Sequence, residues 1–367
     1  MEYEFTSESV SIGHPDKVAD LISDSVATFL LSKNISHRAA IETLVTTNMV
    51  TVAGEYKSNN FDKDEIEKII RNVVAKIGYE QDGFHHEHLN IYNELHGQSP
   101  DIALGTDNFG AGDQGLMFGY ACLETEDYMP MAIYLCHKIL KRVQDERKNH
   151  VWILPDNKSQ VTLTYNDINK PKNIEKIVCS TQHAEDVDIE YVRKQIEEII
   201  RDEIKEDLSS TEFLINPTGR FVIGGPDGDT GLTGRKIIVD TYGGYAPHGG
   251  GAFSGKDCTK VDRSGAYMAR YLAKNIVSSG RASNATVQLS YAIGVVEPTS
   301  VYVYADGKVR PDLANWIKEN VDLSPRGIID KFSLFELDLT ETTLYGHFGR
   351  DNPVSYTHLR AHETFTD

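Results

Sequence analysis

The chain has 367 residues, of which 40% are hydrophobic and 25% charged, so it can bury a substantial core and is not a disordered or fibrous protein. Its 55 acidic and 37 basic residues give a formal net charge of −18, which disfavours binding along a nucleic-acid backbone. Its four cysteines are widely spaced and no apolar run reaches about 18 residues, so we expect a cytoplasmic protein without a disulfide framework or a membrane partner.

Apolar residues recur at helical spacing in five stretches, which predicts helices over residues 15–33, 62–77, 131–148, 188–206 and 261–277. Alternating or β-branched runs predict strands over residues 41–52, 159–165, 174–180, 211–215, 220–224, 236–240, 285–296 and 301–304. Strands and helices alternate in three blocks, over residues 1–97, 110–221 and 222–350. This order predicts an α+β protein whose sheets are each covered by helices on one face. No repeat is visible as residue identity.

Residues 110–115, GAGDQG, have the glycine spacing of a dinucleotide-binding loop. Such a loop follows an apolar strand, whereas residues 105–109 form a polar stretch. A turn that needs small residues is therefore favoured over a nicotinamide or flavin site.

Gly250, Gly255 and Lys256 have the spacing of a phosphate-binding loop, in which backbone N–H groups and a lysine bind phosphate oxygens. Asp257 stands where a P-loop nucleotidase has a magnesium-binding Ser or Thr. The loop therefore favours a polyphosphate ligand without the P-loop fold, and a flexible loop without a ligand is the alternative.

A third glycine-rich loop, over residues 224–234, leads into a segment rich in cations. Five basic side chains lie there: Arg235, Lys236, Lys256, Lys260 and Arg263. In a chain of net charge −18, this cluster points to a multiply charged anion. Alternatively, the cations form solvated ion pairs with nearby aspartates, namely Asp240, Asp257 and Asp262.

Pro15 suits the first position of the first predicted helix and places His14 at its N-terminus, where backbone N–H groups and the helix dipole favour an anion. His14 can donate to a leaving oxygen and Asp16 can bind magnesium. Alternatively, Asp16 only complements the helix dipole.

Together these motifs resemble the S-adenosylmethionine synthetase family over residues 3–350. The matching strings are FTSESV (5–10), GHPDK (13–17), QSPDI (98–102), GAGDQG (110–115), NPTGRF (216–221), YGHFGR (345–350) and the two long glycine loops. Members of the family have three similar domains about a pseudo-threefold axis and form homodimers, or dimers of dimers, with active sites between subunits. The resemblance implies domains over residues 1–97, 110–221 and 222–350, and a mobile active-site loop over residues 98–109.

The family joins ATP and L-methionine. The methionine sulfur attacks the 5′-carbon of ATP, and the triphosphate leaves and is hydrolysed to pyrophosphate and phosphate. A thioether sulfur has no proton to lose, so catalysis depends on alignment and on stabilising the departing polyanion. The resemblance implies methionine adenosyltransferase activity with two Mg²⁺ and one K⁺ in each site.

The resemblance also implies roles for individual residues. Catalytic roles are implied for His14, Lys158, Arg235, Lys236 and Lys256. Further ATP contacts are implied for Asp156, Arg220, Phe221, Asp229 and Ala252. Methionine contacts are implied for Glu55, Gln98, Asp229 and Lys260, magnesium ligands for Asp16 and Asp262, a potassium ligand for Glu42, and an active-site role for Asp113.

After Arg350 the sequence departs from the family, and residues 351–367 read as a foreign tail. His358 and His362 are spaced like a metal-binding pair, but we expect no metal there. Four alternatives to the leading hypothesis stay open: a P-loop ATPase or kinase, a nicotinamide oxidoreductase, a protein that binds nucleotide without catalysis, and an inactive member of the family.

Overall fold

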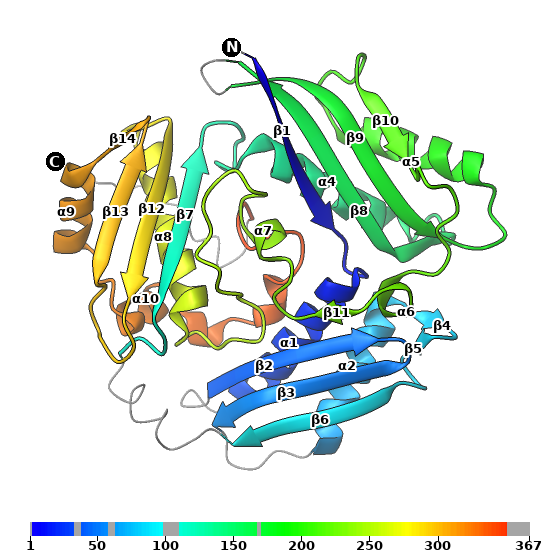
Figure 1. Ribbon diagram of the computed structural model, residues 1–367, viewed down its shortest axis with the longest axis horizontal. Coiled ribbons are helices and arrows are strands. Elements are labelled where there is room, and N and C mark those ends of the chain that lie inside the picture. The colour runs from blue at the N-terminus through cyan, green and yellow to red at the C-terminus, as the bar shows by residue number, and fades with distance from the viewer. Residues whose placement is uncertain (1, 33–37, 58–62, 98–109, 167–169, 351–367) are drawn as a thin grey trace.

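The structure, a computed structural model, describes residues 2–32, 38–57, 63–97, 110–166 and 170–350. Within these ranges the chain forms three four-stranded sheets and a small hairpin, and a long helix packs on each large sheet (Figure 1). The sheets surround the middle of the molecule, where the short helix α7 (Ile237–Asp240) lies (Figure 1). The expected α+β architecture is confirmed. None of the helices in the described ranges has the length and apolar character needed to span a bilayer.

The first sheet has the strand order β11-β2-β3-β6, with its last pair parallel and the others antiparallel. Its strands are β11 (Gly231–Leu232), β2 (Arg38–Thr46), β3 (Met49–Lys57) and β6 (Asn90–Gly97). Helix α1 (Pro15–Ser32) packs on β2, and α2 (Lys63–Ile77) packs on α1. The small hairpin follows α2 and consists of β4 (Glu80–Gln81) and β5 (Phe84–His85).

The second sheet repeats these strand directions in the order β1-β8-β9-β10. Its strands are β1 (Tyr3–Val10), β8 (Ile153–Tyr165), β9 (Pro171–His183) and β10 (Glu212–Ile215). Helix α4 (Met131–Glu146) packs on β1 and β8, and α5 (Ile189–Glu203) packs on α4.

The third sheet has the order β7-β12-β13-β14 and is antiparallel throughout. Its strands are β7 (Gly115–Cys122), β12 (Asn284–Tyr291), β13 (Ser300–Ala305) and β14 (Lys308–Val309). Helix α8 (Val261–Ser278) packs on β7 and β12, α9 (Pro311–Asn320) packs on β13, and α10 (Pro325–Phe332) packs on α8. Two 3₁₀ turns follow, η1 (Leu334–Glu336) and η2 (Leu339–Glu341).

The three sheets exchange edge strands in a closed cycle. Strand β1 precedes α1 in the chain but pairs with β8 in the second sheet. Strand β7 precedes α4 but pairs with β12 in the third sheet, and β11 precedes α8 but pairs with β2 in the first. The repeat therefore lies in the topology, which explains why residue identity does not reveal it.

The five predicted helices are confirmed, whereas four predicted strands need correction. Residues 41–52 belong to the hairpin β2–β3 instead of one strand, because Asn48 turns the chain with a left-handed φ of 52°. The strand predicted over residues 285–296 ends at Tyr291. There the chain turns, and the N–H of Gly294 donates to Ala111 O at 2.8 Å, outside the sheet.

The other two corrections concern short apolar runs. Residues 220–224 form no strand. Two of their carbonyls accept from the end of β9 instead: Val222 O from the side-chain amide of Gln182 and Phe221 O from the N–H of His183. Residues 236–240 contain the helix α7 instead of a buried strand. Lys17 Nζ lies 2.6 Å from Asp240 Oδ1, and this buried contact with α1 overrides the β propensity of the run.

Candidate active site

His14 lies directly before α1, as Pro15 predicts. Its side chain is buried, and Nδ1 accepts a hydrogen bond from the N–H of Asp16 at 3.1 Å. Burial, together with the nearby cations Lys236 and Lys158, lowers the pKa of His14 to about 3, so the ring is neutral at physiological pH. Because Nδ1 accepts, the ring proton is on Nε2, which leaves one N–H donor at the start of the helix.

Asp16 is held by the end of the third glycine-rich loop. Lys236 Nζ lies 2.6 Å from Asp16 Oδ2, and Arg235 Nε lies 3.5 Å from Asp16 Oδ1. The N–H of Leu232 donates to Oδ1 at 3.0 Å. Burial opposes ionisation, but Lys236 and this N–H outweigh it and lower the pKa of Asp16. The carboxylate is therefore ionised beside two cations.

Strand β8 brings Asp156 and Lys158 to the same place. Lys158 is paired with Val10 of β1 and acts electrostatically on both His14 and Asp156. Asp156 Oδ2 accepts from the N–H of Gly225 at 2.9 Å, whereas its buried Oδ1 has no partner among the described residues. Burial, with a smaller contribution from Asp229, raises the pKa of Asp156 to about 6.

We call this group the His14 cluster: His14, Asp16, Asp156, Lys158, Asp229, Arg235 and Lys236. A cavity of about 440 Å³ opens on Arg235 and Lys236, and its other wall includes Glu8 of β1 and Gln160 of β8. The cluster therefore places three cations and a neutral histidine where three segments distant in sequence meet: the start of α1, strand β8 and the third glycine-rich loop with the residues that follow it.

The second group lies around Lys256. Lys256 Nζ lies 2.5 Å from Asp262 Oδ2. The backbone of Lys256 forms an isolated antiparallel β-bridge with that of Ala40 in β2. Ala40 is paired with Glu55 of β3, and Glu42 follows on the same face of β2. We call Glu42, Glu55, Lys256, Lys260 and Asp262 the Lys256 cluster.

The loop before Lys256 fits closely against β2. Gly255 has a φ of 79°, and a Cβ there would lie 1.9 Å from Ile41 O, so glycine is required. Lys260 Nζ lies 2.8 Å from Asp257 Oδ2, which also accepts from the N–H of Ala39. Asp257 thus anchors the loop, and α8 begins only at Val261, so the local structure is not that of a P-loop, where the helix opens at the lysine.

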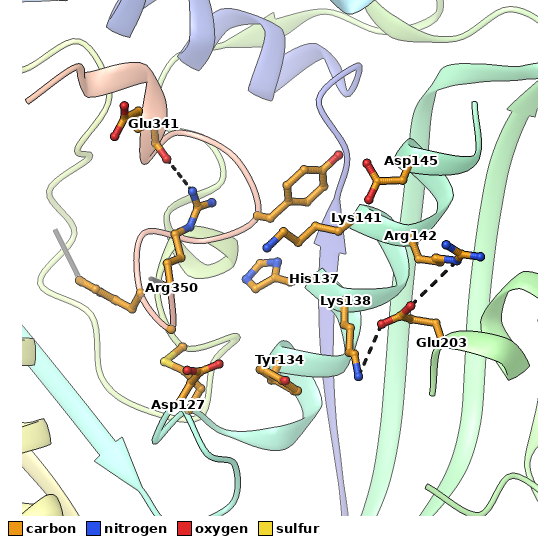
Figure 2. A pocket seen from close by; sticks show the side chains of 14 residues that line it. Asp127, Tyr134, His137, Lys138, Lys141, Arg142, Asp145, Glu203, Glu341 and Arg350 are labelled. Carbon is orange, nitrogen blue, oxygen red and sulfur yellow. Dashed lines mark hydrogen bonds and ion pairs between the residues drawn. The ribbon is translucent and has the colours of Figure 1, made fainter. Parts of the chain in front are cut away.

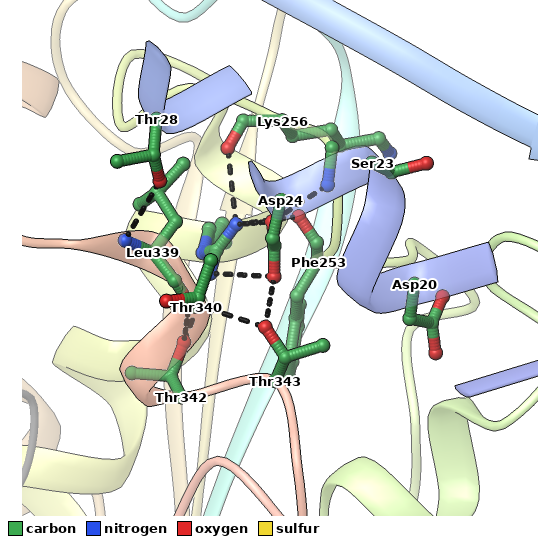
Figure 3. A network of polar contacts seen from close by, with 12 residues as sticks. Asp20, Ser23, Asp24, Thr28, Phe253, Lys256, Leu339, Thr340, Thr342 and Thr343 are labelled. Carbon is green, nitrogen blue, oxygen red and sulfur yellow. Dashed lines mark hydrogen bonds and ion pairs between the residues drawn. The ribbon is translucent and has the colours of Figure 1, made fainter. Parts of the chain in front are cut away.

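Arg263 is not part of the cation cluster predicted from the sequence. It is fully buried and pairs with Asp24 of α1, with Nη1 to Oδ1 at 2.7 Å. The network around Asp24 also reaches Thr342 and Thr343 near the C-terminal end of the described chain (Figure 3). Arg263 therefore stabilises the fold and is unavailable to an anion.

Local ion pairs, the alternative raised from the sequence, do form for Lys256 and Lys260. Asp240 pairs instead with Lys17, which also contacts Asp20 at 3.0 Å. Asp20 in turn accepts from the N–H of Gly234, so this buried group joins α1 to the loop that carries Arg235. Lys17, Asp20 and Asp24 are not among the residues predicted from the sequence, although charged residues within an apolar helical stretch are a signal visible there.

The remaining predicted residues lie apart from these contacts. Arg220 is exposed and pairs with Glu185, and Phe221 is half-buried beside His183, whose Nε2 accepts from its N–H. Ala252 is half-buried beside Gly234, and Asp113 is exposed. Outside the described residues lie Gln98, the predicted loop over 98–109, and the tail over 351–367 with His358 and His362.

The two clusters lie on adjoining elements, since β11, which precedes Arg235, pairs with Leu44 and Val45 of β2 close to Glu42. Across the described ranges, no hydrogen bond or ion pair joins the His14 cluster to the Lys256 cluster. A further cavity of about 760 Å³ lies between α4 and residues 341–350, where Lys138 pairs with Glu203 at 3.5 Å (Figure 2). None of the predicted site residues within the described ranges lines it, so cavity size does not locate the predicted chemistry.

Comparisons with known proteins agree with the resemblance seen in the sequence. Models of the N-terminal, central and C-terminal domains of S-adenosylmethionine synthetase match residues 2–100, 108–221 and 223–358. The S-adenosylmethionine synthase of Paramagnetospirillum magneticum is 53% identical over 363 residues, covering 94% of this chain and 92% of that protein. That of Pelagibacter ubique is 52% identical over 361 residues, with 94% and 92% covered.

A solved structure of an S-adenosylmethionine synthetase from Campylobacter jejuni superposes with a TM-score of 0.90 at 40% identity, covering 96% of both chains. The fold and clusters define an α+β protein of three strand-exchanging units with cations gathered at two places. The chain belongs to the S-adenosylmethionine synthetase family.

Proposed function

We propose that the chain forms S-adenosylmethionine by attack of the methionine sulfur on the 5′-carbon of ATP, after which the released triphosphate is hydrolysed to pyrophosphate and phosphate. Family membership makes the chain a methionine adenosyltransferase that uses ATP and L-methionine. The observation that best supports the detailed chemistry is the neutral His14 set among three cations at the start of α1.

The thioether needs no general base, so the enzyme must align the substrates and stabilise the leaving group. In the proposed reaction His14 donates its Nε2–H to the oxygen that departs from the 5′-carbon. Lys158, Arg235 and Lys236 stabilise the negative charge on the triphosphate. Asp16 and the buried contacts of Lys17 hold the cation-bearing loop in place before substrate binds, which lowers the reorganisation needed during the reaction.

The proposed binding residues follow the family pattern. Those for ATP are His14, Asp156, Lys158, Arg220, Phe221, Asp229, Arg235, Lys236, Ala252 and Lys256. Those for methionine are Glu55, Gln98, Asp229 and Lys260. Asp113 is proposed for a role in the active site, with no ligand assigned to it. The buried, unpartnered Oδ1 of Asp156 supports a ligand at the His14 cluster, because a buried acceptor without a hydrogen bond is costly.

Asp16 and Asp262 are the proposed ligands of two magnesium ions, and Glu42 is the proposed ligand of one potassium ion. The aspartates fit magnesium, because this ion prefers carboxylate oxygens and completes its coordination with phosphate and water oxygens. Each aspartate already faces a cation, Lys236 Nζ at 2.6 Å or Lys256 Nζ at 2.5 Å, so both positions accept positive charge. Bound magnesium would neutralise part of the phosphate charge.

We also propose a homodimer, or a dimer of dimers, in which each active site combines the His14 cluster of one copy with the Lys256 cluster of another. The lack of a hydrogen bond or ion pair between the two clusters in the described ranges supports this arrangement, since the proposed ATP contacts are divided between them. Mixing an inactive His14→Asn chain with an inactive Lys256→Ala chain tests it. Recovery of activity in the mixture is expected, and no recovery despite subunit exchange would contradict shared sites.

The function is tested by incubating the purified chain with ATP, L-methionine, Mg²⁺ and K⁺ and measuring S-adenosylmethionine, pyrophosphate and phosphate together. We expect the three products in equal amounts, dependent on methionine, with a large loss in His14→Asn. Binding of ATP without any of the three products would instead identify a binding protein or an inactive member of the family.

A further inference from the structure

The turn after β5 brings together three side chains that can ligate a metal: His85, Glu87 and His88. One ligand atom from each lies within 4.8 Å of the other two. His85 is half-buried, and Glu87 and His88 are exposed to solvent. We propose that these three residues form a binding site for a divalent transition ion such as Zn²⁺, separate from the proposed active site.

The backbone of the turn sets the geometry. The N–H groups of His88 and Leu89 both donate to His85 O, at 3.0 and 3.2 Å, which closes a single helical turn. Residues three apart in such a turn share one side. The rings of His85 and His88 lie 4.9 Å apart between centroids, and the ring of His86 also stacks on His85, at 4.7 Å.

The turn is fixed to the body of the protein, so little ordering is needed to bind an ion. Arg71 of α2 donates to His86 O at 2.7 Å and to Leu89 O at 3.1 Å. Phe84 and Leu89, which flank the ligands, are buried in the core. Ligands held by such supports lose less conformational entropy on binding.

The donor set selects the ion. Two imidazole nitrogens with one carboxylate match zinc, which binds such three-residue sets and keeps a fourth position for water. Magnesium prefers an all-oxygen shell and is disfavoured here. His85 Nδ1 accepts a hydrogen bond from the N–H of Glu87 at 3.2 Å, and this bond is given up when a ring nitrogen binds the ion. Asparagine at position 85 can accept the same bond without offering a ring nitrogen.

The site lies outside both proposed clusters. The hairpin that carries it contacts the third glycine-rich loop through Gln81 Nε2, which donates to Gly224 O at 2.6 Å. The hairpin also contacts the turn between β2 and β3, where the N–H of Asn48 donates to Gly83 O at 2.6 Å. An ion on the turn would therefore stabilise the hairpin against these neighbours and raise the melting temperature of the chain.

The test titrates Zn²⁺ alone into the chelator-treated full chain, with excess Mg²⁺ present to fill oxygen-rich sites. Variants His85→Asn and His88→Ala remove ligands, whereas His86→Ala is a matched control in the same turn. A further control, His358→Ala with His362→Ala, removes the histidine pair of the tail. Melting temperatures without metal verify that each variant is folded.

We expect one zinc ion per chain, an affinity at least about tenfold weaker in His85→Asn and His88→Ala, and no change in either control. The gain in melting temperature on adding Zn²⁺ should likewise be smaller in His85→Asn and His88→Ala than in the unaltered chain and the two controls. Equal affinity in all variants, loss of binding in the tail control, or no binding by the unaltered chain would each overturn the proposal.

Discussion

Arg263 and Asp24 form a two-pronged ion pair in which neither side chain is exposed to solvent, with Nη1 to Oδ1 at 2.7 Å and Nη2 to Oδ2 at 3.3 Å (Figure 3). The pair joins α8 to α1 across 239 residues of sequence. Arg263 Nη1 also donates to Lys256 O at 3.3 Å, so the same guanidinium holds the backbone of a proposed catalytic lysine.

Breaking this pair should strongly destabilise the protein. Arg263→Met leaves the Asp24 carboxylate buried without its cation and should lower the free energy of unfolding by about 3–5 kcal/mol. Chemical denaturation measures the change. The exposed pair of Lys194 and Glu198 provides the control, since Lys194→Ala should change stability by less than about 1 kcal/mol. Similar effects of the two substitutions would contradict a structural role for Arg263.

Asp156 should make the unliganded protein less stable as pH rises. Its pKa is about 6 in the folded chain against an ordinary value of 3.8, so the folded state binds more protons between these values. The stability contributed by the protonated form is present below about pH 4 and is lost as pH rises past 6. Asp156→Asn keeps an acceptor for the N–H of Gly225 and should gain up to about 3 kcal/mol at pH 7 relative to pH 4. Denaturation at both pH values measures this, and a gain independent of pH would refute it.

His14→Asn should separate catalysis from folding. The asparagine oxygen can still accept from the N–H of Asp16, so stability should change by less than about 0.5 kcal/mol, whereas loss of the Nε2–H donor should slow adenosyl transfer by about 100-fold or more. Single-turnover experiments and thermal melts measure the two effects.

The pH profile of the unaltered chain gives an independent test of His14. Because the pKa of His14 is about 3, its protonation should not slow the reaction between pH 5 and 8. An acidic limb with an apparent pKa of 6 to 7 that disappears in His14→Asn would show that the ring titrates in the usual range. A limb that persists in the variant points to another group, such as Asp156.

Lys256→Ala should mainly lower the rate of the reaction, whereas Lys260→Ala should mainly lower the affinity for methionine. Lys256 contacts Asp262 and Lys260 contacts Asp257, so each can be removed without breaking the other pair. Lys256→Ala should slow triphosphate departure by about 100-fold and leave methionine affinity within about twofold, whereas Lys260→Ala should mainly weaken methionine binding. Single-turnover rates and methionine titrations distinguish them. Equal losses in both measurements for Lys256→Ala would show that its role is misassigned.

Local patterns were sufficient to predict much of the structure. Helical periodicity and Pro15 predict α1 and place His14 at its N-terminus, and the ordered motif strings are enough to indicate the family. These predictions depend on residues close together in the chain, because the spacing of apolar residues there indicates the type of secondary structure.

Partners distant in the sequence could not be predicted in this way. Periodicity predicts a strand over residues 159–165 but not that β1, which was not predicted, is its neighbour. Arg263 was grouped with the cations because it is close to Lys256 in sequence, whereas its partner Asp24 lies on another helix. The run over residues 236–240 has strand-like composition, and only the buried Lys17 explains why it forms a helical turn.

The exchange of edge strands bears on how the chain folds as it leaves the ribosome. The hairpin β2–β3 is complete at Lys57, but its neighbour β11 is made only at Gly231–Leu232. At roughly 5–20 residues per second, translation leaves that edge uncovered for on the order of ten to thirty seconds. An open strand edge can pair with other chains. The nascent protein therefore passes through an aggregation-prone interval during which a chaperone would protect the open edge, and a chain released before Leu232 would never acquire the strand that covers it.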